Sequence, residues 1–232
     1  GGARPAHDVW DRRCYPSPGD AVGGGNLPAN TMATALAFLG LAPMAATDIP
    51  AIDPSKPAAA RDCGRMVMAM LERGQSARQL LSIEAFENAI AAVMLTGGST
   101  NAVLHLLAIA REAGIPLDLD RFDRISRITP VLADLKPGGR FTAPDMAQAG
   151  GLRLVARRLL DAGRLHDCPT VTGATLHEEA AKARETPNQP VLREWSQPLS
   201  SSGGIAILRA SSMTSPVPLP RSRPAASRPV TS

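Results

Sequence analysis

Apolar residues recur at helical spacing through the middle of the chain, and turn or capping residues separate the repeats. The first repeat opens at Asn30 or Thr31, either of which can cap a helix, and closes at Gly40. A second repeat covers residues 58–73 and stops at Gly74. Both patterns predict amphipathic helices that end at a glycine. The inward face of the second helix is expected to carry Met66, Met70 and Leu71.

Two longer repeats flank a pair of glycines. We expect a helix over residues 83–95 to be capped by Ser82 and to break at Gly97 and Gly98. The next helix, in "NAVLHLLAIAREAG", is expected to end at Gly114. Shorter repeats predict further helices over residues 120–126, 144–148, 152–162 and 176–184.

Strand patterns are scarce by comparison. Only "CPTVTG" at residues 168–173 and "GIAILRA" at residues 204–210 have the composition of strands. The pattern as a whole predicts an α/β protein of which this chain is a mostly helical piece, lacking its central strands.

The composition agrees with helices packed on one another. Of the 232 residues, 44% are hydrophobic but only 3% are aromatic, so Ala, Leu, Ile, Val and Met must build the core. Such a core favours closely packed helices over a sandwich or barrel. No apolar run approaches the roughly 18 residues that a membrane span needs, and no signal pattern opens the chain. The expected location is the cytoplasm, without membrane contact.

Charge and composition set the two ends apart from the middle. The net charge is +4, and residues 211–232 contain three arginines and no acid, which leaves the rest of the chain nearly neutral. A folded basic face for nucleic acid is therefore not expected. The same stretch holds five prolines and is expected to be disordered, whereas residues 1–28 are rich in Gly, Pro and Arg and have no periodicity.

The glycine pair lies in the sharpest candidate for chemistry, "TGGSTN" at residues 96–101. Glycines let a backbone approach a ligand closely, and the following helix offers free N–H groups to an anion. The motif has neither the lysine of a P-loop nor the three glycines of a dinucleotide site. The alternative is a helix connection with a glycine break and a cap. The candidate residues are Gly97, Gly98, Ser99, Thr100 and Asn101.

Other polar residues give weaker signals. Lys136 and Arg140 flank the Pro-Gly-Gly turn of "LKPGGR", which either binds a carboxylate or is an ordinary solvated turn. His105 is expected to be a core residue, and His166 and His177 to lie on loop and helix surfaces. Surface or capping roles are expected for Glu84, Glu87, Asp123 and Asp134, and reduced thiols for Cys14, Cys63 and Cys168.

Several segments together resemble one enzyme family. They are "ANTMATALAFLGL", "EAFENAIAAVMLTGGSTNAVLHLLAIAREAGI", "FDRISRITPVLADLKPGGRF", "AGGLRLVARRLLDAGRLHDCPTVTG" and "GGIAILR". In this order they resemble the dihydroxy-acid dehydratase family, which also contains phosphogluconate and sugar-acid dehydratases. The resemblance covers about residues 29–209, and "AFENAI" and "DCPTVTG" favour the branched-chain dihydroxy-acid member.

The resemblance implies a fold and a reaction. Residues 29–200 would be part of a three-layer α/β/α N-terminal domain, and residues 201–210 would begin a C-terminal β-barrel that is truncated here. Members of the family use an iron-sulfur cluster and Mg²⁺ to remove water from a 2,3-dihydroxy acid. The product is a 2-keto acid of valine and isoleucine biosynthesis. The implied partners are this small acid and a second copy of the chain.

The resemblance also implies where the site lies and indicates that one cluster ligand is missing. It puts residues 97–101, with Lys136, near the cofactor or substrate, and Asn30 and Thr31 near the cluster. The family's cluster cysteine falls at Gly23 when counted back from Asn30, and glycine cannot ligate iron. We therefore expect the isolated chain to bind neither cofactor and to be inactive. A frame-disrupted or truncated gene would explain both ends. The alternatives are a non-catalytic fragment or interaction module and a sugar-acid or phosphogluconate dehydratase relative.

Overall fold

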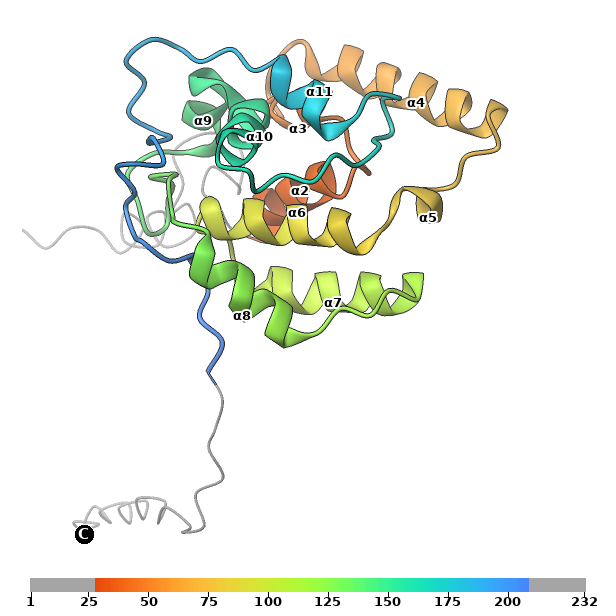
Figure 1. Cartoon of the computed structure of the whole chain (residues 1–232). Helices are drawn as coiled ribbons and strands as arrows, with labels where there is room; N and C mark the ends of the chain where they lie inside the picture. The colour runs from red at the N-terminus through yellow and green to blue at the C-terminus, as the bar shows by residue number, and fades with distance from the viewer. Residues whose placement is uncertain (1–27, 209–232) are drawn as a thin grey trace, which may run out of the picture.

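The computed structural model describes residues 28–208, in which ten helices are joined by loops (Figure 1). The helices are α2 Pro28–Phe38, α3 Met44–Thr47, α4 Lys56–Glu72, α5 Ala77–Leu80, α6 Ile83–Leu95, α7 Asn101–Ala113, α8 Leu119–Ile128, α9 Ala143–Ala149, α10 Gly151–Asp161 and α11 Leu176–Ala181. None of these helices is long and apolar enough to cross a membrane.

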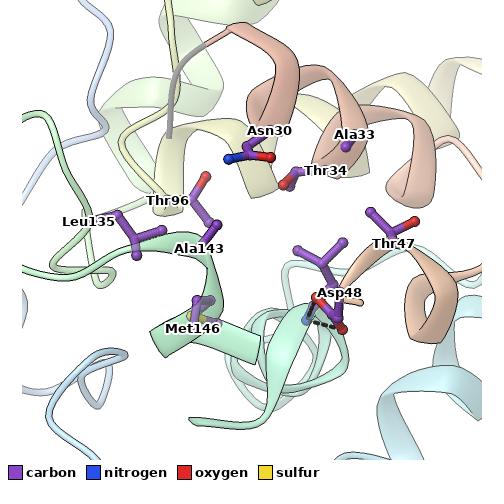
Figure 2. A pocket seen from close by; sticks show the side chains of 10 residues that line it. Asn30, Ala33, Thr34, Thr47, Asp48, Thr96, Leu135, Ala143 and Met146 are labelled. Atoms are coloured by element: carbon purple, nitrogen blue, oxygen red, sulfur yellow. Dashed lines mark hydrogen bonds between the residues drawn. The ribbon is translucent and has the colours of Figure 1, made fainter. Parts of the chain in front are cut away.

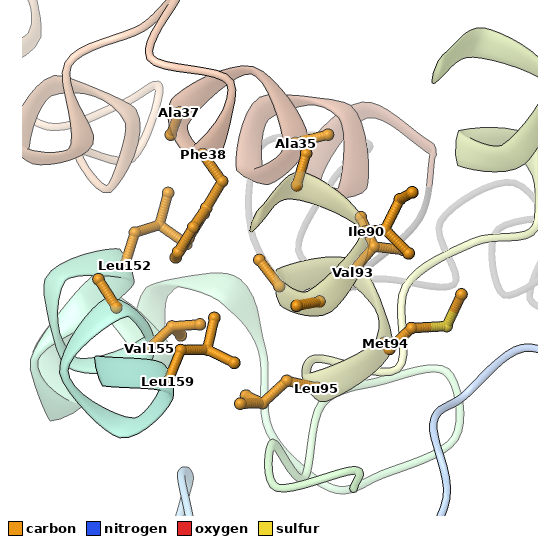
Figure 3. Close-up of a cluster of buried hydrophobic side chains, with 14 of the residues drawn as sticks. Ala35, Ala37, Phe38, Ile90, Val93, Met94, Leu95, Leu152, Val155 and Leu159 are labelled. Atoms are coloured by element: carbon orange, nitrogen blue, oxygen red, sulfur yellow. The ribbon is translucent and has the colours of Figure 1, made fainter. Parts of the chain in front are cut away.

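Helix α6 is the centre of the core. From Ala85 to Leu95 every residue except Glu87 is buried, because the segment is apolar on nearly all sides. It packs against α2, α7, α8 and α10, and Figure 3 shows side chains of α2, α6 and α10 meeting in one cluster. Phe38, Phe86 and Leu159, which are large members of the core, are completely buried. The core is therefore built by helix packing, as the scarcity of aromatic residues predicts.

Local signals in the sequence explain the ends of the two central helices. The Ser82 hydroxyl accepts a hydrogen bond from the Ala85 N–H (3.2 Å) and caps α6. Gly114 has a φ of 73° and ends α7 in the left-handed conformation. Both ends were predicted from the sequence and are confirmed.

Other boundaries differ from the prediction. Helix α2 begins at Pro28, ahead of the expected Asn30, because proline suits a first helical turn. Helix α11 ends at Ala181, short of residue 184. The short helices α3 and α5 have only four residues each, too few to give a periodic signal.

The inward face expected for α4 is wrong in part. Met70 is buried, Met66 is half-buried, and Leu71 is 70% exposed. Figure 1 shows the reason: α4 lies at the edge of the molecule, and among the helices it packs mainly against short α3. Val67 and Met68 are exposed with Leu71, so this helix carries an apolar surface.

The two expected strands are absent from residues 28–208, where only isolated β-bridges occur. Residues 168–173 form a turn around a bridge between Pro169 and Thr175. Residues 204–208 pair with no strand, and residues 209 and 210 lie outside the described range. A strand needs a neighbour to complete its hydrogen-bond ladder, and no neighbouring strand is described here. The described fold is thus mostly helical, consistent with part of an α/β domain.

Candidate functional site

The turn between α6 and α7 is built from its two glycines. Gly97 has a φ of 62°, a conformation that other residues rarely adopt. Gly98 is buried, and a Cβ atom at this position would lie 2.8 Å from the Thr31 side chain and 3.0 Å from Val93. Glycine is therefore required at both positions, for backbone conformation at the first and for space at the second.

Thr31 joins this turn to the first turns of α2. Its hydroxyl accepts a hydrogen bond of 3.0 Å from the Ser99 N–H, and its side chain is completely buried. The Gly98 N–H donates to the Val93 carbonyl at 2.9 Å. Two segments that are 68 residues apart in sequence thus meet through one buried hydroxyl.

The far side of the turn faces solvent. Thr100 and Asn101 are exposed, and the Ser99 hydroxyl accepts hydrogen bonds from the Asn101 N–H (3.3 Å) and side-chain amide (3.2 Å). A hydroxyl that accepts in this way still has its own proton to donate. Since α7 has no acidic residue in its first turn, its N-terminus keeps a partial positive charge. The arrangement can hold a small anion.

A cavity of about 60 Å³ lies beside the turn. This volume suits one or two water molecules. Figure 2 shows side chains of α2, α9 and the loop after α3 around it, with Thr96 from the turn itself. The lining residues are Asn30, Ala33, Thr34, Thr47, Asp48, Thr96, Leu135, Ala143, Met146 and Leu152.

Asp48 is the titratable group in this cavity, and sequence reasoning missed it. Both of its carboxylate oxygens lie 3.0 Å from the Leu152 N–H, which donates to them at the start of α10. Gly151 makes the approach possible, because a Cβ atom there would lie 2.1 Å from the carboxylate. Burial raises the pKa of Asp48 to about 6, against the opposing effects of the Leu152 N–H, Arg153 and Lys56. The Gly150-Gly151 pair was the available signal.

The "LKPGGR" turn is held by an internal ion pair. The Arg140 guanidinium lies 2.6 Å from the Asp134 carboxylate, which is 5% exposed, and stacks over the Phe141 ring. Burial by itself would raise the pKa of Asp134, but the hydrogen bonds and charge of Arg140, together with the charge of Arg193, outweigh burial and lower the pKa. The surface role expected for Asp134 is therefore wrong, and Arg140 is already paired. Lys136 is half-buried and follows Leu135, which lines the cavity.

His166 lies exposed in a loop and His177 lies part-exposed on α11, as predicted, whereas His105 and Glu87 differ from expectation. His105 is exposed on α7 and is not a core residue. Glu87 is a convergence point on α6: it pairs with Arg121, with Arg124 at 3.7 Å and with His166 at 2.9 Å. These contacts join α6, α8 and the loop after α10. They have the character of a structural network.

The cysteines among the described residues do not form a metal centre. Cys168 is buried, its sulfur lies 3.5 Å from the Asn88 amide nitrogen, and burial raises the pKa of its thiol. Cys63 lies on α4. No group of three His, Cys, Asp or Glu side chains between residues 28 and 208 is placed to hold a metal ion. The described residues therefore do not bring together the set of cysteine thiolates that holds an iron-sulfur cluster. Cys14 and Gly23 lie outside this range.

Comparison with known proteins gives the family. Residues 6–179 match the model of the dihydroxy-acid/6-phosphogluconate dehydratase N-terminal domain, and the chain belongs to this family. The match begins upstream of residue 29, so it takes in part of the segment that the sequence analysis set apart.

Within this family, the chain is similar over most of its length to curated relatives named dihydroxy-acid dehydratase. One from Roseiflexus sp. (strain RS-1) is 51% identical over 203 residues, which cover 87% of this chain and 36% of the relative. One from Koribacter versatilis is 50% identical over 193 residues, covering 83% and 34%. One from Thermus thermophilus is 47% identical over 201 residues, covering 86% and 36%. The chain thus spans about a third of the length of these relatives.

Proposed function

We propose that this chain is part of a dihydroxy-acid dehydratase, a hydro-lyase that converts a 2,3-dihydroxy acid into a 2-keto acid and water. The reaction would serve branched-chain amino acid biosynthesis in the cytoplasm. Sequence identity of about half to relatives of that name, over 83–87% of the chain, is the observation that carries the proposal. A sugar-acid or phosphogluconate dehydratase is the alternative within the family.

In this proposal the turn at residues 97–101 binds the carboxylate of the substrate. The N-terminus of α7 supplies positive potential, and Ser99 and Asn101 supply hydrogen-bond donors. Thr31 orients the Ser99 backbone through the buried hydrogen bond. Asn30 lines the neighbouring cavity, and Lys136 follows Leu135, which lines it too. Both side chains would contact the polar end of the same ligand.

We further propose that the isolated chain holds no cluster and does not turn over substrate. The family's iron-sulfur cluster and Mg²⁺ would supply Lewis-acid chemistry at the substrate hydroxyl. Gly23 stands where the cluster cysteine of the family is expected, and the described residues do not gather a substitute set of donors. Binding of the acid and turnover are therefore separable in this chain.

A second candidate function is an interaction module that pairs with a complete dehydratase subunit. The exposed apolar surface of α4, formed by Val67, Met68 and Leu71, favours it. Sedimentation of the chain mixed with a complete dihydroxy-acid dehydratase tests this function. A joint species that Leu71→Lys abolishes supports the module, and independent sedimentation of the two proteins counts against it.

Binding of the acid is tested by following backbone amide NMR signals as a branched-chain 2,3-dihydroxy acid is added. We expect shifts concentrated at residues 97–101, lost in Asn101→Ala and retained in His105→Ala, a matched change one turn along the exposed face of α7. Stronger competition by gluconate or phosphogluconate would favour the sugar-acid alternative. Absence of shifts at the turn with any of these acids contradicts the proposed site.

Turnover is tested on the same preparation by iron and sulfide analysis and by keto-acid formation. We expect no bound iron, no sulfide and no keto-acid product. A stoichiometric cluster together with product would overturn the proposal that the isolated chain is inactive.

A further inference from the structure

The C-terminal end of α6 receives hydrogen bonds from a distant segment. The last carbonyls of a helix have no partner within it and need donors from elsewhere. The Leu95 carbonyl accepts from the Leu132 N–H at 2.9 Å. The Met94 carbonyl accepts from both the Gly97 and Gly204 N–H groups, each at 3.3 Å. A segment more than a hundred residues downstream therefore helps to finish the helix that leads into the glycine turn.

Ser126 on α8 anchors that segment. Its carbonyl accepts from the Gly203 N–H at 2.7 Å, and its hydroxyl donates to the Ile205 carbonyl at 2.5 Å. Ser126 is 5% exposed and Ile205 is 4% exposed, so both bonds are shielded from water. One residue thus holds the backbone of residues 203–205 from two sides.

The segment also touches the glycine turn directly. A Cβ atom on Gly204 would lie 2.8 Å from the Gly97 Cα atom, so a side chain at residue 204 forces the two backbones apart. A Cβ atom on Gly203 would lie 2.8 Å from the Met94 Cβ atom and 2.9 Å from the Ser126 hydroxyl. Glycine at residue 204 is therefore explained by close backbone approach, and glycine at residue 203 by the lack of space beside two side chains.

We propose that residues 203–205, anchored by Ser126, form a clasp that holds the turn at residues 97–99 in position for its ligand. Ser126 and Gly204 act as positioning residues: Thr31 fixes the turn from the side of α2, and the clasp fixes it from the side of α8. The proposal relies on the proposed function only for the statement that the turn binds a ligand. The mechanical coupling itself depends on the contacts alone.

Hydrogen exchange at single amides tests the clasp. We expect Gly204→Ala to speed exchange at the Gly97, Gly98 and Ser99 amides about tenfold or more, while exchange within α10 stays unchanged. The matched control is Gly138→Ala, because no atom lies within 4 Å of the added methyl group there.

A milder variant guards against general misfolding. Ser126→Ala removes only the hydroxyl bond to the Ile205 carbonyl and is expected to produce the same local pattern, whereas Ser202→Ala at an exposed position should not. Unchanged exchange at the turn in both the Gly204 and Ser126 variants overturns the clasp. Equal acceleration throughout the protein overturns it as well, since the contact would then serve overall stability.

The exchange experiment uses no ligand, so its result is independent of the proposed function. If the variants loosen the turn but the wild-type chain binds no dihydroxy acid, the clasp stands and the proposed function fails. If the acid binds at the turn and the variants leave both exchange and affinity unchanged, the function stands and the clasp fails. Where both hold, we expect Ser126→Ala to weaken binding of the acid.

Discussion

Asp48 provides a test of how burial and helix capping combine in the cavity. Its carboxylate accepts the Leu152 N–H at the start of α10, yet burial raises its pKa from 3.8 to about 6. Replacement by asparagine keeps a carbonyl oxygen for the Leu152 N–H and removes the buried charge. The free energy of unfolding of the two proteins should therefore differ in its dependence on pH.

The direction in which pH changes the free energy of unfolding follows from the raised pKa of Asp48. The folded protein binds the Asp48 proton more tightly than the unfolded chain, so this group stabilises the fold below about pH 4 and loses that contribution as pH rises to about 6. One pKa unit corresponds to about 1.4 kcal/mol, which makes the loss about 3 kcal/mol. Asp48→Asn does not titrate, so we expect its stability relative to wild type to increase by about this amount between about pH 4 and pH 7.

Urea unfolding followed by circular dichroism at several pH values measures the difference. Other carboxylates titrate identically in both proteins and cancel in the comparison. Asp62→Asn on exposed α4 is the matched control and should change the free energy of unfolding by about 1 kcal/mol or less. If Asp48→Asn is equally destabilising at every pH, or becomes relatively less stable as pH rises, the buried-carboxylate reasoning is refuted.

Three further predictions concern the core and the turn. Thr31→Val should lower the free energy of unfolding by about 1–3 kcal/mol, because it leaves the Ser99 N–H without its acceptor. Thr31→Ser keeps the hydroxyl and should retain most of that stability, as measured by urea unfolding. Phe86→Ala should cost about 3–5 kcal/mol in thermal unfolding, whereas Leu71→Ala should cost about 0.5 kcal/mol or less, because only the first side chain is buried. Asp134→Asn should remove stability at neutral pH and reduce its loss on acidification, because the pKa of Asp134 is lowered in the fold; urea unfolding at several pH values measures both effects.

The candidate site could be predicted from the sequence only in pieces. The residues 97–101 were found because glycines, a hydroxyl pair and a helix start are adjacent in the chain. Thr31 and Asn30 were named through a family resemblance, and the structure adds that the Thr31 hydroxyl accepts the Ser99 N–H. Asp48 was missed because its partner at the start of α10 lies 104 residues away, and the Gly150-Gly151 pair alone does not say what approaches it.

The amino-acid sequence by itself determined most of the helices and several of their ends. Helical periodicity, the Ser82 cap and the Gly114 terminus depend on hydrogen bonds and φ angles within one or two turns of the chain, so neighbouring residues suffice to encode them. The family motifs are likewise contiguous stretches.

Only the tertiary structure decided what those helices bury and what they leave exposed. It placed the apolar face of α4 at the edge of the molecule and buried the Asp134 carboxylate against Arg140. It also paired the backbone of residues 203–205 with α6 and α8, where the sequence predicts a strand. Burial and pairing of this kind depend on which distant segments meet. No local pattern contains that information, because the free energy of each contact comes from both partners together.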